Sequence, residues 1–203
     1  MELRLLNKEE LTILYREEMV YDFPRSELKP LSGMLRLMDK GCYRPLIALM
    51  DGEKVGYAIL WLPRAGEGAL LEYLGILRGK RNQGLGGALL TKLQKEYPSM
   101  FGEVEAQDSS DPAENDLRRH RVGFYLRNGF RLLDYDCALF GVHFNCIYFG
   151  PETDDRKIEA IHRSIYADYF FPAHFERYIQ LPLHPGEEIH PAPQWVEEEE
   201  ETS

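Results

Sequence analysis

The sequence predicts an α/β fold: a mixed, mostly antiparallel sheet of about seven strands with helices on both faces and a C-terminal helical extension. Two extended runs, PLIALM and KVGYAILWL, flank Asp51-Gly52, a strong hairpin signal. The nearly all-apolar run ALLEYLGIL is typical of a strand buried on both faces in the middle of a sheet. Strand and helix patterns alternate after it, which predicts helices packed on both sides of one sheet.

The first third of the chain predicts a short strand, two helices and a hairpin. Residues 3–6 form the strand. Asn7 with Glu10 makes the reciprocal arrangement that caps a helix, which would run to about residue 21. The segment FPRSELKPL breaks this helix, and residues 31–40 would form a second helix closed by Gly41. The hairpin around Asp51-Gly52 follows.

The middle of the chain predicts a strand, helix, strand, helix and a last hairpin. The strand ALLEYLGIL leads into a glycine-rich segment and its helix, and FGEVEAQ is the next strand. Asp111 caps a further helix, with Pro112 at its first position, that ends at Asn128-Gly129. A two-residue loop Gly141-Val142 would close the final hairpin and place Cys137 opposite Cys146, as reduced thiols.

The predicted organisation is one domain over residues 1–150, a helical aromatic-rich extension over 151–180, and a proline-broken acidic tail over 181–203. A chain of 203 residues suffices for one well-buried core, whereas two full domains would be cramped. The run of glutamates at residues 197–201 favours disorder at the end of the tail. The aromatic residues of the extension predict packing, either against the sheet or across a homodimer.

Composition and charge restrict the classes of function. Hydrophobic residues make up 44% of the chain, without an apolar run long enough to span a bilayer or a secretory signal at the start. We therefore expect a cytoplasmic protein, and the three cysteines argue against a disulfide framework. A net charge of −10 disfavours nucleic acid and anionic membranes as partners.

The segment RGKRNQGLGG, before a helical leucine pattern, predicts a phosphate-binding loop. Bare backbone at a helix start offers unpaired N–H groups and a positive dipole end, and basic residues precede it. A Walker A loop is excluded because Gly87 is followed by Ala88-Leu89, and the dinucleotide fingerprint because the glycines are spaced differently. The sequence also lacks a convincing set of carboxylates for the metal ion that a nucleotide-triphosphate enzyme needs. No metal site is expected. A purely structural glycine cap is the alternative.

Two motifs resemble one family. LGILRGKRNQGLGGALL looks like motif A of the GNAT superfamily of acetyl-CoA-dependent N-acetyltransferases, whose signature is Arg/Gln-x-x-Gly-x-Gly/Ala. RVGFYLRNGFRLL resembles the family's motif B, and the order of elements agrees to about residue 150. The resemblance implies transfer of an acetyl group from acetyl-CoA to an amine. The alternative is a CoA-binding module that has lost catalysis and acts as a sensor or partner domain.

The resemblance also implies roles for individual residues. Backbone amides at the loop would hold the coenzyme A pyrophosphate, two side chains would stand at the loop's entrance, and two strand amides would hold the acetyl carbonyl and the pantetheine arm. In that order these are Gln83, Gly84, Leu85, Gly86 and Gly87; Arg81 and Asn82; and Ile76 and Leu77.

Tyr125 matches the family's tyrosine that protonates the leaving thiolate, with filling of the core as the alternative role. Glu72, a lone carboxylate in the apolar run, is the first candidate for the general base or an amine anchor. It lies where many relatives place an acidic residue facing the acceptor. An ion pair with a neighbouring Lys or Arg is the competing interpretation. Glu103 and Glu105 on the next strand, or water, are the fallback bases.

No clear motif in the sequence identifies one of the cofactor contacts or the binding site of the acceptor amine. Many relatives have an Asn after the fifth strand, for which only Ser109, Ser110 or Asn115 are available here. FPRSELKP is either a lid over the acceptor or a connector. Carboxylates with aromatic residues suit a small cationic amine or a peptide or protein amine; the candidates are Glu18, Tyr21, Asp22, Phe23, Glu27, Asp134, Tyr135 and Asp136.

Overall fold

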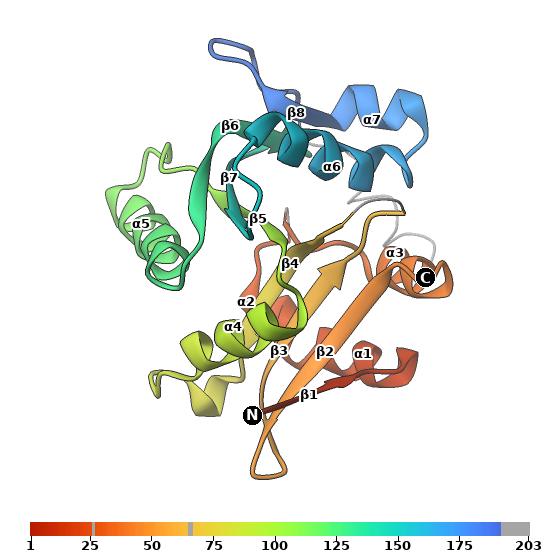
Figure 1. Cartoon of the computed structure of the whole chain (residues 1–203), viewed down its shortest axis with the longest axis vertical. Coiled ribbons are helices and arrows are strands. Elements are labelled where there is room, and N and C mark those ends of the chain that lie inside the picture. Colours follow the sequence, from red (N-terminus) through yellow and green to blue (C-terminus); the bar gives the residue numbers. More distant parts are fainter. Residues whose placement is uncertain (26, 65–66, 192–203) are drawn as a thin grey trace.

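The protein is described by a computed structural model over residues 1–25, 27–64 and 67–191, and in these residues it forms one eight-stranded sheet with helices on both faces (Figure 1). The strand order is β1-β2-β3-β4-β5-β7-β6-β8, and every neighbouring pair is antiparallel except β4 and β5. The strands are β1 Glu2–Leu5, β2 Tyr43–Met50, β3 Glu53–Trp61, β4 Ala69–Ile76, β5 Met100–Glu105, β6 Arg131–Leu139, β7 Val142–Phe149 and β8 Ile179–Leu183.

The sheet separates two hydrophobic cores. The helices are α1 Lys8–Leu14, a π-helical turn η1 Tyr15–Met19, α2 Val20–Asp22, α3 Leu31–Asp39, a 3-10 turn η2 Arg78–Lys80, α4 Leu85–Glu96, α5 Pro112–Arg127, α6 Asp155–Ala167 and α7 Pro172–Tyr178. Buried residues of α1, α3 and α6 pack on one face, for example Leu11, Met34 and Ile165. Leu89 of α4 and Val122 of α5 pack on the other face. The predicted mixed fold is confirmed.

The first helix begins where the capping pattern predicts. The Asn7 side chain accepts a hydrogen bond from the Glu10 N–H at 2.8 Å, and the Glu10 carboxylate accepts one from the Asn7 N–H at 3.1 Å. Two N–H groups that the first turn leaves unpaired are thereby satisfied. The helix that follows this cap buries Leu11 and Leu14.

The two predicted hairpins have different outcomes. Met50 pairs with Glu53 across Asp51-Gly52, as predicted. The last turn was misplaced by one residue, because the positive φ values fall on Phe140 (51°) and Gly141 (84°). Leu139 then pairs with Val142 and Cys137 with Phe144, so the predicted Cys137–Cys146 register is wrong. Both cysteines are buried and free, as is Cys42.

The C-terminal segment packs against the sheet. Helices α6 and α7 lie with β8 at the top of Figure 1, and β8 pairs with β6. Buried Ile158 and Ile165 join the core that α1 and α3 also cover. The first residues of the segment predicted as a proline-broken tail, Leu181 to Leu183, therefore belong to a strand. The glutamate run lies outside the described residues.

None of the helices within the described ranges has the length and apolar character needed to cross a membrane.

Candidate active site

A cleft opens where β4 and β5 separate. The two strands pair only from Ala69 opposite Met100 to Leu71 opposite Gly102. Beyond these pairs, side chains from both strands, from the segment between α2 and α3, and from α5 and α6 line a cleft of about 1890 Å³. The separation leaves backbone groups of the two strand edges available to a ligand.

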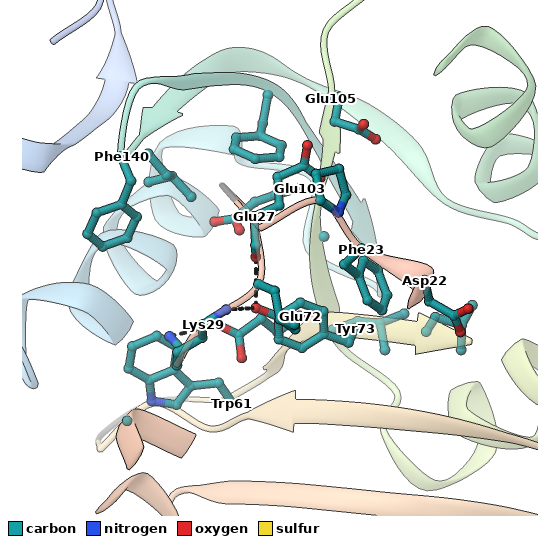
Figure 2. Close-up of a pocket in the computed structure, with 18 of the residues that line it drawn as sticks. Asp22, Phe23, Glu27, Lys29, Trp61, Glu72, Tyr73, Glu103, Glu105 and Phe140 are labelled. Atoms are coloured by element: carbon teal, nitrogen blue, oxygen red, sulfur yellow. Dashed lines mark hydrogen bonds and ion pairs between the residues drawn. The ribbon is translucent and has the colours of Figure 1, made fainter. Parts of the chain in front are cut away.

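A β-bulge in β4 turns two consecutive side chains into this cleft. Ile59 pairs with Tyr73 and Leu60 with Leu71, so Glu72 is the extra residue of the bulge. In a regular strand Glu72 and Tyr73 would point to opposite faces. Here both line the cleft, as Figure 2 shows.

The glycine-rich loop presents free backbone amides at the start of α4. Gly84 is the N-cap, with a φ of 73° that favours glycine. Within the described part of the chain, the N–H groups of residues 83–87 have no protein acceptor. The loop therefore has the unpaired donors and the positive helix end that suit a phosphate.

Gly86 and Gly87 serve close helix packing. A Cβ on Gly86 would stand 3.3 Å from the Phe124 ring, and one on Gly87 would stand 3.2 Å from Oδ1 of Asn128, both on the α5 side. A Cβ on Gly84 would meet nothing within 4 Å. The space beside Gly86 where a side chain would lie is therefore occupied by α5.

The two strand amides assigned to the acetyl group differ. The Leu77 N–H donates to the Val55 carbonyl at 3.0 Å, so it is used within the sheet. Because hydrogen bonding alternates along an antiparallel edge, the Ile76 N–H faces away from β3 and toward the gap beside β5. Ile76 is thus the better placed of the two for an oxyanion.

The basic residues before the loop are each paired with a carboxylate. Arg81 pairs with Asp22 and, through Nε, donates a hydrogen bond to the Ile76 carbonyl at 3.0 Å. Asp22 additionally accepts a hydrogen bond from Tyr57 at 2.7 Å. The Arg81–Asp22 contact therefore joins α2 to the end of β4. The ion pairs are Arg78 with Glu18 at 3.4 Å, Lys80 with Glu53 at 2.6 Å, and Arg81 with Asp22.

Tyr125 lies on α5 and lines the cleft. Its ring packs edge-on against Phe124 and Phe130, with centroids 5.3 and 5.4 Å away. Burial raises the pKa of Tyr125 to about 12, against the opposing effect of the Arg121 charge. The phenol therefore keeps its proton at neutral pH and can act only as a proton donor.

Glu72 is held in a cage on the acceptor side. Its Oε1 pairs with Nζ of Lys29 at 2.8 Å, and Tyr43 donates a hydrogen bond to Oε2. The same ammonium stands 4.0 Å from the centroid of the Trp61 ring. The ion pair that the competing interpretation predicted for Glu72 is therefore present. Its cation, Lys29, comes from the FPRSELKP segment and not from a neighbouring strand.

Glu103 is held by the C-terminal extension. Its Oε1 contacts Nε2 of His162 at 2.8 Å and accepts a hydrogen bond from Tyr166 at 2.6 Å. Burial disfavours the charged imidazole, but hydrogen bonds to Cys146 and Glu103 outweigh it and raise the pKa of His162 to about 10. The sequence analysis missed this site role. Its signal is the spacing of His162 and Tyr166, which places both on one helix face.

The remaining acceptor candidates fall into separate groups. Phe23 packs edge-on against Tyr73 at 4.9 Å, inside the cleft. Asp134 and Asp136 line a different hollow of about 820 Å³ beside β8. Tyr135 lines the same hollow and bonds His162. Glu18 and Tyr21 line neither hollow and contact Arg78. Ser109 and Asn115, the candidates for the cofactor contact, bond each other within their loop.

Comparison with known proteins identifies the domain. The model of the GNAT acetyltransferase domain matches residues 42–132, whereas curated proteins gave no match in a sequence search. A protein from Bacteroides thetaiotaomicron, described as a GNAT-family acetyltransferase, superposes with a TM-score of 0.68 at 19% identity. The match covers 81% of this chain and 96% of that one.

Two further structures share the fold. One is the PaiA N-acetyltransferase of Thermoplasma acidophilum in complex with coenzyme A, with a TM-score of 0.50, 20% identity, and coverage of 74% and 98% of the two chains. The other is a variant of the Vibrio cholerae spermidine N-acetyltransferase, at 0.52, 13%, 73% and 92%. These identities establish likeness of fold alone. Residues 42–132 thus match the GNAT acetyltransferase domain, and the described part of the chain shares the fold of solved GNAT structures.

Proposed function

We propose that this protein transfers an acetyl group from acetyl-CoA to a primary amine, by direct attack of the amine on the thioester in a ternary complex. The acceptor is a small cationic molecule or an amine of a peptide or protein. The donor lies between the start of α4 and the gap between β4 and β5, and the acceptor enters from the face covered by α2, α3 and α6.

The observation that carries the acceptor class is the cage around Lys29. A primary ammonium of the chain itself is held there by the Glu72 carboxylate and the Trp61 ring, with a side chain only 15% exposed. Such a site offers both ion pairing and cation–π attraction. Glu27, Glu103 and Glu105 add further carboxylates along the same cleft. Together they favour a cationic acceptor over a neutral or anionic one.

The donor side supports acetyl-CoA. The free amides at the start of α4 suit the pyrophosphate, and the Ile76 N–H suits the oxygen that becomes negative as the amine attacks. Tyr125 stands in the same cleft with a proton to give to the departing sulfur. The T. acidophilum neighbour, which was solved with coenzyme A, has the same fold.

The proposal is tested by thermal shift with acetyl-CoA, followed by thiol release with a panel of amines. We expect acetyl-CoA to raise the melting temperature, and polyamines or lysine-containing peptides to release thiol faster than neutral or acidic amines. Stabilisation by acetyl-CoA without thiol release from any amine would instead favour the catalytically silent sensor. Absence of any acetyl-CoA effect would contradict the donor site.

A further inference from the structure

We propose that Glu27, in the segment between α2 and α3, is the general base that takes a proton from the acceptor ammonium. This inference rests on the proposed function and replaces Glu72 in that role. FPRSELKP then acts as part of the catalytic site as well as a connector.

The other carboxylates of the cleft are already committed to partners. A carboxylate whose oxygens already contact a cation or accept a hydrogen bond is less available to a proton of the substrate. These partners are Lys29 and Tyr43 for Glu72, His162 and Tyr166 for Glu103, Arg121 for Glu105, and Arg81 and Tyr57 for Asp22.

Glu27 differs because its side chain is unpaired while its backbone is fixed. Among the described residues, no hydrogen bond or ion pair involves its carboxylate, which is half-buried and lines the cleft. Its carbonyl accepts a hydrogen bond from the Tyr73 hydroxyl at 2.9 Å, and that hydroxyl accepts one from the Lys29 N–H at 2.8 Å. In Figure 2, Glu27 lies between the β4 side chains and those of Glu103 and Glu105.

The charges around Glu27 connect it to the proposed acid. Burial, and then the negative charge of Glu105, raise the pKa of Glu27 to about 7. On α5, Arg121 and Arg118 oppose this rise and Glu114 adds to it. Arg121 and Glu105 also act on Tyr125. The unpaired carboxylate and the phenol therefore share the same charged neighbours at the cleft.

The protons of the reaction then balance. Glu27 takes one proton from the ammonium, and the freed lone pair forms the C–N bond at the thioester carbon. As the C–S bond breaks, Tyr125 gives its proton to sulfur, and a second proton from nitrogen restores the phenol through water. The proton on Glu27 passes to solvent, which leaves amide, thiol and one released proton.

The test is the single-turnover rate of acetyl transfer by wild type and Glu27→Gln between pH 5.5 and 10, with acetyl-CoA and the best cationic amine of the panel. We expect the wild-type rate to rise through pH 7 and then level off. Glu27→Gln should be slower by about 100-fold at pH 8. Its rate should rise only as the amine itself deprotonates, near pH 10 for an alkylammonium.

Glu17→Gln, an exposed carboxyl on η1, is the matched control and should behave as wild type. Glu72→Gln should raise the KM for the amine and keep the rise in rate through pH 7. Equal single-turnover rates for wild type and Glu27→Gln at pH 8, with the same rise in rate through pH 7, would overturn the assignment of Glu27 and leave the proposed function intact. A wild type that binds acetyl-CoA but acetylates no amine would overturn both.

Discussion

At the scale of single residues, the cleft combines a phenol that is protonated at neutral pH with a carboxyl group that can accept a proton there. Burial has the same physical effect on both, because it disfavours the charged form of each group. For Tyr125 the result is a pKa of about 12, and for Glu27 one of about 7. One environment thus separates a proton donor from a proton acceptor.

Removal of the Tyr125 hydroxyl should therefore affect chemistry more than binding. We expect Tyr125→Phe to lower turnover at least tenfold at the optimum pH, with acetyl-CoA affinity nearly unchanged, because the thiolate loses its proton donor. Thiol-release kinetics and acetyl-CoA titration measure the two quantities. Tyr97→Phe, at the end of α4, is the control. Unaltered turnover of Tyr125→Phe would remove this residue from the mechanism.

At the scale of elements, two local irregularities make the cleft. The bulge at Glu72 directs two consecutive β4 side chains into the cleft, and the glycines at the start of α4 let that helix approach α5. Both features depend on contacts between elements, since the bulge is a mismatch with β3 and the glycines are opposed by Phe124 and Asn128.

A side chain at Gly86 should separate the two helices. We expect Gly86→Val to abolish acetyl-CoA binding, because its Cβ would start 3.3 Å from the Phe124 ring and would push the first turn of α4 off its position. Thermal shift with and without acetyl-CoA measures this. Gly79→Ala, whose Cβ would meet nothing within 4 Å, should bind normally. A normal titration of Gly86→Val would contradict the loop assignment.

At the scale of the whole molecule, the C-terminal extension completes the lining of the cleft. Helix α6 lies beyond the region that the family model matches, yet it supplies the two side chains that hold Glu103 on β5. Ile158 and Ile165 of the same helix belong to the shared core. The extension and the sheet therefore stabilise each other through an apolar core that surrounds the buried contact between His162 and Glu103.

This contact should make stability depend on pH. The pKa of His162 is raised from 6.5 to about 10, so its stabilising effect is complete below pH 6.5 and is lost as pH rises through 10. We expect His162→Gln to lower the free energy of unfolding by about 3 kcal/mol at pH 6, since Glu103 loses its buried partner. The difference from wild type should shrink toward pH 10.

Denaturant unfolding at both pH values measures this difference, with the exposed His184→Gln as control. A difference that is the same at pH 6 and pH 10 would contradict a charged His162 in the folded protein.

The features that the sequence predicted correctly depend on neighbours along the chain. The cap at Asn7, the turn at Asp51-Gly52 and the helix start at Gly84 each involve residues a few positions apart, whose conformational preferences a short stretch encodes. The prediction failed where a tight turn could be placed on either of two adjacent residue pairs, as at Phe140 and Gly141.

By itself, the sequence determined the local elements, such as the helix that starts at Gly84, and it predicted the donor loop and the tyrosine, because all of these lie in continuous motifs. Only the tertiary structure decided which carboxylates are free. Glu72 meets Lys29, and Glu103 meets His162, across distances in sequence that no local pattern spans. The chemistry of a carboxyl group depends on the burial and charges around it, and folding alone brings those together. Glu27 became the candidate base because the fold left it half-buried and unpaired.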